Sequence, residues 1–266
     1  MEEARYRFYG QLNDLLPLHR RQVTYNHSFK PGQSVKDAIE AQGVPHPEIG
    51  LGLINGISVG FEYRLQPGDR ISIYPPFTAI DIEELSQVHI PPPVPARFVL
   101  DVHLGRLATY LRLLGFDTLY THNCDDDRLA QLAAEEQRIL LTRDRGLLKR
   151  SQVSHGYLPR SDDPRQQLLE VTERYGLSEQ MNPWGRCPRC NGLVEPVDKQ
   201  TVAELLPPHT RQSYSDFRRC TACGQVFWKG AHCQRIQALI ESVGPPHQST
   251  SSALDQGSPA GTGMLR

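Results

Sequence analysis

The chain has 266 residues, of which 38% are hydrophobic and 22% are charged. This is a globular composition without fibrous or collagen-like bias, and the length allows roughly one to three domains. The 29 basic and 30 acidic side chains leave a formal net charge of −1, which by itself neither favours nor excludes a nucleic-acid partner. No apolar run approaches the roughly 18 residues of a membrane span, and the N-terminus MEEARYRFYG lacks the apolar stretch of a secretory signal. We therefore expect a cytoplasmic protein with no membrane partner.

Residues 1–86 are predicted to form a small α+β domain. The segment RYRFYG alternates polar and apolar residues as a strand does, and Asn55-Gly56 between two apolar runs is a hairpin signal. Ser34 is placed to cap a helix that Gly43 ends. The apolar face of this helix consists of Val35, Ala38 and Ile39. With a last strand after the turn LQPGD, the order of elements predicts a β-grasp fold.

The end of this domain resembles the ubiquitin-like sulfur-carrier proteins of thiamin and molybdopterin synthesis. The resemblance is carried by the hairpin and by the pattern L-x-x-G-D-R-I-x-I-x-P-P at Leu65–Pro76. Those carriers act through a free C-terminal Gly-Gly, whereas Pro75, Pro76 and Phe77 stand here and the chain continues. Carrier chemistry is therefore not expected, and we predict that the domain recognises a protein partner or serves as a scaffold.

Two composition breaks frame the rest of the chain. Residues 87–96 contain the run HIPPPVPA and are predicted to be an extended, semi-rigid linker. Residues 244–266 have almost no apolar side chains and are predicted to be disordered. We expect residues 1–86 to fold alone, and residues 97–243 to keep their activity without them.

After the linker, apolar strands and helices alternate. The strands are RFVLD, FDTLYT and RILLTRD, and the helices between them are LGRLATYLRLLG and DDDRLAQLAAEEQ. Such an alternation predicts a parallel sheet with right-handed crossovers and flanking helices.

Three acidic positions are predicted to meet at one edge of this sheet. Asp101 and Asp144 follow strands, and Asp126 lies in the acidic cluster that opens the helix between them. Ligands of open α/β sheets bind at the carboxyl ends of the strands. Clustered carboxylates there favour a hard cation, Mg²⁺ or Mn²⁺, which can activate water against a phosphodiester. The alternative is a structural role for each: a helix cap for Asp126, a salt bridge for Asp101 and a turn for Asp144.

The segments RFVLDVHLGRLATYLRLLGFDTLY and DDDRLAQLAAEEQRILLTRDRGLL resemble the C-terminal RNase family named after the Mut-seven exonuclease, a PIN-like group. The family's first aspartate matches Asp101, its T-R-D aspartate matches Asp144, and its middle aspartate matches Asp126, three residues before Leu129. The resemblance implies a PIN-like nuclease domain at 97–180, with these three catalytic aspartates holding Mg²⁺ or Mn²⁺ and RNA as substrate. The register within the cluster DDD stays open, and no counterpart of a further carboxylate is evident.

Basic residues follow the last of these aspartates. Arg143 and Arg145 are predicted to bind RNA phosphates beside the metal, and the alternative is a solvated helix face.

Residues 181–243 contain two C-x-x-C pairs and are predicted to form a zinc ribbon. The predicted zinc ligands are Cys187, Cys190, Cys220 and Cys223. Four thiolates on two tight turns complete a tetrahedral Zn²⁺ site and leave no open position, so the zinc is predicted to be structural. Aromatic and basic side chains of this ribbon are predicted to contact RNA; they are Arg218, Arg219, Trp228 and Lys229.

Taken together, the sequence predicts an α/β PIN-like parallel sheet, preceded by an α+β β-grasp domain and followed by a small zinc ribbon. The predicted function is that of a metal-dependent ribonuclease whose ribbon assists RNA binding. The alternative is a non-catalytic RNA- or ribosome-binding adaptor with structural carboxylates.

Overall fold

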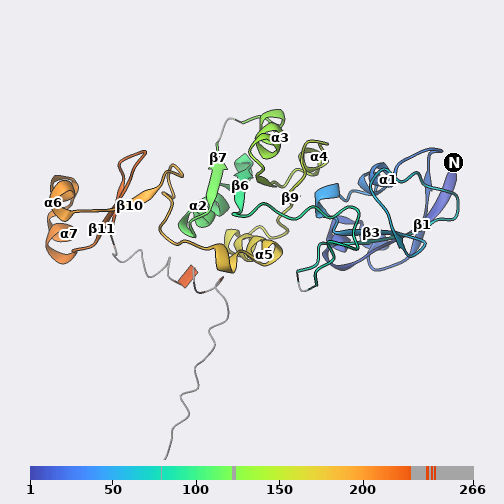
Figure 1. Ribbon diagram of the computed structural model, residues 1–266, viewed down its shortest axis with the longest axis horizontal. Helices are drawn as coiled ribbons and strands as arrows, with labels where there is room; N and C mark the ends of the chain where they lie inside the picture. The colour runs from blue at the N-terminus through green and yellow to red at the C-terminus, as the bar shows by residue number, and fades with distance from the viewer. Residues whose placement is uncertain (79, 122–123, 229–237, 240, 242, 244–266) are drawn as a thin grey trace, which may run out of the picture.

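A computed structural model describes residues 1–78, 80–121, 124–228, 238–239, 241 and 243. Figure 1 shows three parts in a row: the N-terminal domain at one end, an α/β domain in the middle and a small cysteine-containing module at the other end. Of the sequence predictions, those on Lys229 and on the tail 244–266 lie outside the described residues. In the described part of the chain, no helix has the length and apolarity needed to cross a membrane.

The N-terminal domain (residues 1–78) is a mixed five-stranded sheet of order β2-β1-β5-β3-β4. Its strands are β1 (Glu2–Phe8), β2 (Tyr25–Phe29), β3 (Leu51–Ile54), β4 (Ile57–Ser58) and β5 (Arg70–Tyr74). Its helix is α1 (Val35–Ala41), and its 3₁₀ turns are η1 (Gly10–Leu15), η2 (Leu18–Arg20) and η3 (His46–Glu48). Strands β1 and β5 are parallel and the other pairs are antiparallel. This confirms the predicted β-grasp arrangement.

Local signals in the sequence account for this domain. The Ser34 hydroxyl accepts the Asp37 N–H at 3.1 Å and caps α1. Asn55 and Gly56 both have positive φ, 54° and 89°, which is the backbone of a tight hairpin whose twist matches that of its strands. The predicted cap and hairpin are therefore both present.

The α/β domain (residues 97–182) is built on an all-parallel sheet of order β7-β6-β8-β9. Its strands are β6 (Arg97–Leu100), β7 (Asp117–Tyr120), β8 (Ile139–Leu141) and β9 (Gly156–Tyr157). Its helices are α2 (Gly105–Leu113), α3 (Asp126–Glu135), α4 (Arg145–Leu148) and α5 (Pro164–Tyr175), with 3₁₀ turns η4 (Val102–Leu104) and η5 (Leu177–Gln180). The predicted parallel sheet is confirmed, and β9 and α5 extend it beyond the predicted elements.

Alternate residues of each central strand face opposite layers. Phe98 and Leu100 pack with α2 and α5, whereas Val99 packs with α3 and α4. Because both faces of the sheet are covered, its strands are apolar throughout, as the sequence pattern indicated.

The four-cysteine module (residues 184–228) is a small antiparallel sheet of order β10-β11-β12. Its strands are β10 (Val194–Val197), β11 (Phe217–Cys220) and β12 (Val226–Trp228). The insertion between β10 and β11 contains α6 (Lys199–Val202), η6 (Ala203–Leu205) and α7 (Pro208–Ser213).

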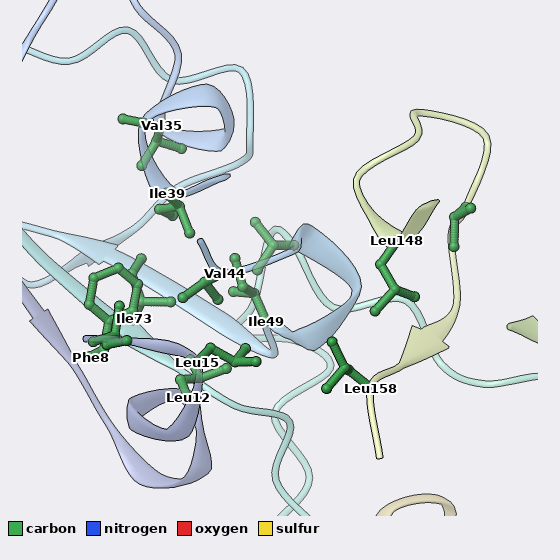
Figure 2. Close-up of a cluster of buried hydrophobic side chains, with 14 of the residues drawn as sticks. Phe8, Leu12, Leu15, Val35, Ile39, Val44, Ile49, Ile73, Leu148 and Leu158 are labelled. Atoms are coloured by element: carbon green, nitrogen blue, oxygen red, sulfur yellow. The ribbon is translucent and has the colours of Figure 1, made fainter. Parts of the chain in front are cut away.

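The N-terminal domain and the α/β domain share one hydrophobic core. Figure 2 shows Leu148 and Leu158 of the α/β domain next to Ile49 and Val44 of the N-terminal domain. All four side chains are at most 9% exposed. The proline-rich segment 87–96 has no helix or strand, yet it does not separate two independent cores.

Candidate active site and metal centre

Asp101 and Asp144 lie at the same edge of the parallel sheet. Asp101 directly follows β6, and Asp144 comes shortly after β8. These two strands are hydrogen-bonded neighbours, with Leu100 opposite Leu141. The carboxyl ends of β6 and β8, here called the rim, are therefore adjacent, so Asp101 and Asp144 could belong to one site.

Thr142 connects the two acidic residues. Its side chain is fully buried, its hydroxyl donates to Oδ2 of Asp101, and the same hydroxyl oxygen accepts the Asp144 N–H at 2.9 Å. Asp101, only 6% exposed, also accepts the N–H groups of Arg143 at 3.1 Å and of His103 at 2.8 Å. A carboxylate has about four acceptor positions. Three donors thus fix the orientation of Asp101 and leave room for a cation or a water.

These contacts bear on the structural alternatives. Within the described residues Asp101 forms no ion pair with an arginine, so its buried charge is satisfied by N–H and O–H donors. Asp144 accepts the Gly146 N–H at 2.6 Å and caps α4. Both carboxylates therefore have local structural roles. Asp101 accepts donors on both of its oxygens and keeps about one acceptor position, whereas Asp144 accepts through Oδ1.

The acidic cluster DDD divides its three carboxylates among different roles. Asp125 caps α3 by accepting the Arg128 N–H at 2.7 Å, and Asp127 pairs with Arg150. Asp126 is exposed, and over the described residues its carboxylate takes part in no hydrogen bond or ion pair. Asp126 is thus the member of the cluster left available for a ligand.

Asp126 does not join the other two aspartates in a closed cluster. Among the described residues, the four cysteines are the only group of three or more possible metal ligands whose ligand atoms lie close together. Helix α3, which begins at Asp126, covers the face of the sheet opposite to α2.

An open cleft of about 670 Å³ lies beside Asp144. Its polar lining consists of His103, Arg106, Arg143, Asp144, Asp162 and Gln167. Asp162 pairs with Arg143 through a carboxylate that is 90% exposed. The cleft therefore combines two carboxylates with two guanidinium groups.

Asp162 is the acidic residue that sequence reasoning missed. It follows β9, a strand of two residues that is too short to show any periodicity. The signal S-D-D-P indicates only the cap of α5, which Asp163 provides by accepting the Arg165 N–H at 3.1 Å.

The basic residues after β8 have different partners. Arg143 reaches the cleft, and its guanidinium also donates to the Ser161 carbonyl at 3.4 Å. Arg145 instead donates to the Leu15 carbonyl of the N-terminal domain at 2.9 Å, and Lys149 donates to the Glu40 carbonyl at 2.6 Å. Arg145 uses one N–H of its guanidinium at this domain interface while the residue stays exposed, so its role in RNA binding stays a prediction.

The four predicted zinc ligands converge. Their sulfur atoms all lie within 4.8 Å of one another, with Cys187 to Cys223 at 3.7 Å and Cys190 to Cys220 at 3.4 Å. Four sulfurs around one tetrahedral Zn²⁺, with Zn–S bonds of about 2.3 Å, lie about 3.8 Å apart. The four-cysteine cluster therefore fits a structural zinc ion.

The two turns that present these cysteines need unusual backbone. Asn191 and Gly224 have φ of 67° and 74°, as expected for tight knuckles. A Cβ at Gly192 would lie 2.9 Å from the Cys220 sulfur, so only glycine allows the two knuckles to approach. At Cys220, burial acts to raise the pKa, but N–H donors from Cys223 and Ala222 outweigh it and lower the pKa to about 7. At Cys187, burial instead raises the pKa to about 12, so the pKa shifts within the cluster do not all favour the thiolate.

Polar side chains attach the first knuckle to the start of β7. Arg112, 6% exposed, donates to the carbonyls of Thr118 and Pro188 at 2.9 and 3.2 Å. The Asn191 amide donates to Asp117 at 2.7 Å and accepts the Thr118 N–H at 2.9 Å. Because β7 begins at Asp117, the four-cysteine module docks at the end of the sheet opposite to the rim.

Three predicted RNA contacts, Arg218, Arg219 and Trp228, lie on the sheet of the four-cysteine module. Arg218 and Arg219 are consecutive, exposed residues of β11, so they point to opposite faces. Trp228 is half-buried and packs against the cluster that contains Phe217.

Comparison with known proteins covers most of the chain. A family model described as the Mut7-C RNAse domain matches residues 96–240, more than half of the chain. A second, described as Mut7-C ubiquitin, matches residues 1–81. Neither the curated proteins nor the solved structures give a match.

Proposed function

Because the chain belongs to the Mut7-C RNase domain family, we propose that it is a metal-dependent ribonuclease whose active site is the rim. Membership of the family implies a ribonuclease, and we propose in addition which residues form its active site. The observation that carries it is the adjacency of β6 and β8, which brings Asp101 and Asp144 to one edge and links them through Thr142.

Asp101 and Asp144 would hold Mg²⁺ or Mn²⁺, with Asp126 as the third ligand. The oxygens of Asp101 and Asp144 suit a hard cation, because each of these carboxylates has acceptor positions that the protein does not fill. The Asp126 carboxylate does not converge with them among the described residues, so it would have to approach when the ion binds. A bound divalent ion would supply an activated water and neutralise charge on the phosphodiester. Asp162 would add a fourth negative charge beside the cleft, and Arg106 and Arg143 would bind the RNA phosphates there.

The four-cysteine module would hold a structural zinc and extend the RNA-binding surface. Arg218, Arg219, Trp228 and Lys229 would contact RNA away from the rim. The module docks at the start of β7, at the end of the sheet opposite to the rim. These side chains would therefore bind a part of the RNA that extends beyond the rim, and not the scissile phosphate itself.

The N-terminal domain would also offer a surface to a protein partner. Leu18 and Ile57 are 81% and 70% exposed. The sulfur-carrier function is not proposed, since Pro75 and Pro76 occupy the place of the Gly-Gly tail.

The second candidate is an RNA-binding adaptor without catalysis. It is favoured by the fact that Asp101 accepts three protein donors and Asp144 caps a helix, as structural carboxylates do.

Asparagine substitutions separate the two candidates. Asp101→Asn or Asp144→Asn keeps the shape and much of the hydrogen bonding but removes the charge that binds a hard cation. If the rim is the active site, Mn²⁺-dependent cleavage of single-stranded RNA falls by at least about 10³-fold, while the protein stays folded. If the carboxylates only cap, stability falls by about 1–2 kcal/mol and cleavage is unchanged.

The acidic cluster provides matched controls. Asp126→Asn should reduce cleavage strongly, whereas Asp125→Asn and Asp127→Asn should act more mildly, because those two carboxylates cap α3 and pair with Arg150. Undiminished cleavage by a folded Asp101→Asn/Asp144→Asn double variant would reject the proposed active site in favour of the adaptor.

A further inference from the structure

The contact between the N-terminal domain and the α/β domain is centred on a buried carboxylate. Glu48, in η3, is 0% exposed. It accepts the Leu158 N–H at 2.9 Å, and the Arg160 guanidinium binds both of its oxygens at 3.0 and 3.1 Å. Arg174 lies 3.7 Å from the same carboxylate. All three partners of Glu48 belong to the other domain.

This carboxylate cannot be removed without leaving buried charge. Burial acts to lower the pKa of Arg160, but Glu48 outweighs it and raises the pKa. Arg160 Nε and Arg174 Nη1 are buried and have no hydrogen-bond partner among the described residues. A neutral side chain at position 48 would therefore leave the positive charges of Arg160 and Arg174 without the carboxylate that balances them.

The segment that Glu48 holds leads directly to the cleft. Two residues after Arg160 stands Asp162, which pairs with Arg143. The other side of the segment is fixed by α5, where Glu170 accepts the N–H groups of Arg160 and Ser161 at 2.6 and 2.9 Å. Arg143 in turn donates its N–H to Asp101. A continuous chain of contacts thus runs from Glu48 to the rim.

A second set of contacts ties the other side of the rim to the same domain. Helix α4 follows Asp144, and both of its ends are bound to the N-terminal domain, through Arg145 to the Leu15 carbonyl and through Lys149 to the Glu40 carbonyl. The two segments that supply Asp144 and Asp162 are therefore both docked on the N-terminal domain.

From these contacts we propose that the N-terminal domain, called the ubiquitin domain from here on, positions the active-site rim of its own chain. Glu48 is the positioning residue for the segment 158–162. The proposal rests on the proposed ribonuclease function and names the part of the chain that positions its active site. It also departs from the expectation that residues 97–243 act alone, because the shared core and the buried ion cluster make the N-terminal domain part of the support of the site.

The test uses the full chain with Glu48→Gln. Glutamine can still accept the Leu158 N–H through its oxygen, but it cannot hold the Arg160 guanidinium as an ion pair. The measurements are kcat and KM for a single-stranded RNA with Mn²⁺, together with hydrogen exchange over residues 156–163. Glu3→Gln is the matched control, because it makes the same change at an exposed position of β1.

We expect Glu48→Gln to lower kcat by about tenfold or more with KM within about threefold, since a misplaced rim costs rate more than binding. Exchange over 156–163 should rise, and Glu3→Gln should match the wild type in every respect. Should Glu48→Gln fail to fold, Arg160→Lys replaces it; lysine keeps the charge but loses the two-point contact, and a fall of kcat is again expected.

The outcomes distinguish the two proposals. A wild type that cleaves RNA together with a folded Glu48→Gln or Arg160→Lys protein of unchanged kcat would overturn the positioning role and leave the ribonuclease intact. A wild type without Mn²⁺-dependent cleavage would overturn the ribonuclease, and the positioning role with it.

Discussion

The two outer modules of this protein dock on the same parallel sheet by different means. The ubiquitin domain buries apolar side chains against the α/β domain and adds an ion cluster around the fully buried Glu48. The four-cysteine module contacts the sheet through polar groups around the half-buried Asp117 and the buried Arg112. The first interface resembles the interior of a single domain, and the second resembles a hydrogen-bonded clasp.

The places of contact differ as well. The ubiquitin domain contacts segments that follow β8 and β9, next to the rim, whereas the four-cysteine module contacts the residues at which β7 begins. We conclude that changes at the first interface should alter the rate of the reaction, and changes at the second should alter the stability of the module. The experiments below test that division.

The largest effect is expected from loss of zinc. Structural zinc supplies about 10 kcal/mol or more to small modules that bind it, so Cys190→Ser should release the metal and unfold residues 184–228. Elemental analysis should find about one zinc per wild-type chain. Hydrogen exchange should show lost protection over this range, with protection of 156–163 retained.

The control for this prediction is Cys124→Ser, because Cys124 is a half-buried free thiol that packs in the core and not in the four-cysteine cluster. It should keep the zinc. A wild-type protein purified without chelator and found free of zinc would contradict the assignment.

A smaller but global effect is expected from the shared core. Leu148, the last residue of α4, is fully buried in the core shared with the ubiquitin domain, so Leu148→Ala should cost about 2–5 kcal/mol. Since both domains contribute to this core, both should unfold in one shifted transition. Leu205→Ala, at a position 61% exposed, should leave the transition in place. Two separate transitions, of which one is unaffected by Leu148→Ala, would show that the domains are energetically independent.

The sequence predicted those features that are signalled locally. Strands with both faces buried and a following aspartate placed Asp101 and Asp144, and the double C-x-x-C spacing located a cluster that the structure confirms. A strand of two residues, Gly156–Tyr157, has no detectable period, so Asp162 could not be placed beside the cleft.

Features that arise from contacts between distant residues were not predictable. Arg145 stands beside the predicted active site in sequence, yet its partner is the Leu15 carbonyl, 130 residues away in the chain. Glu48 lies in an ordinary turn, and only the tertiary fold brings Arg160 and Arg174 to it. Charge patterns along one chain do not reveal such partners, because they depend on how the two domains pack.

The smallest effect concerns Asp117, and it tests whether the clasp of the four-cysteine module is separate from the chemistry. Asp117 is bound by Arg138 at 3.0 Å, Arg186 at 3.4 Å and Asn191 at 2.7 Å. Asp117→Asn keeps one oxygen acceptor but removes the charge shared by the two arginines. We expect a loss of about 2 kcal/mol, seen as a decrease of roughly 5 °C in Tm.

The value of kcat should stay that of the wild type, because Asp117 begins β7 and the rim lies at the other end of the sheet. Asp216→Asn makes the same change at an exposed position and should alter neither quantity. If Asp117→Asn lowered kcat as much as Glu48→Gln does, both outer modules would position the rim. The proposed division, in which one interface affects kcat and the other affects stability, would then be wrong.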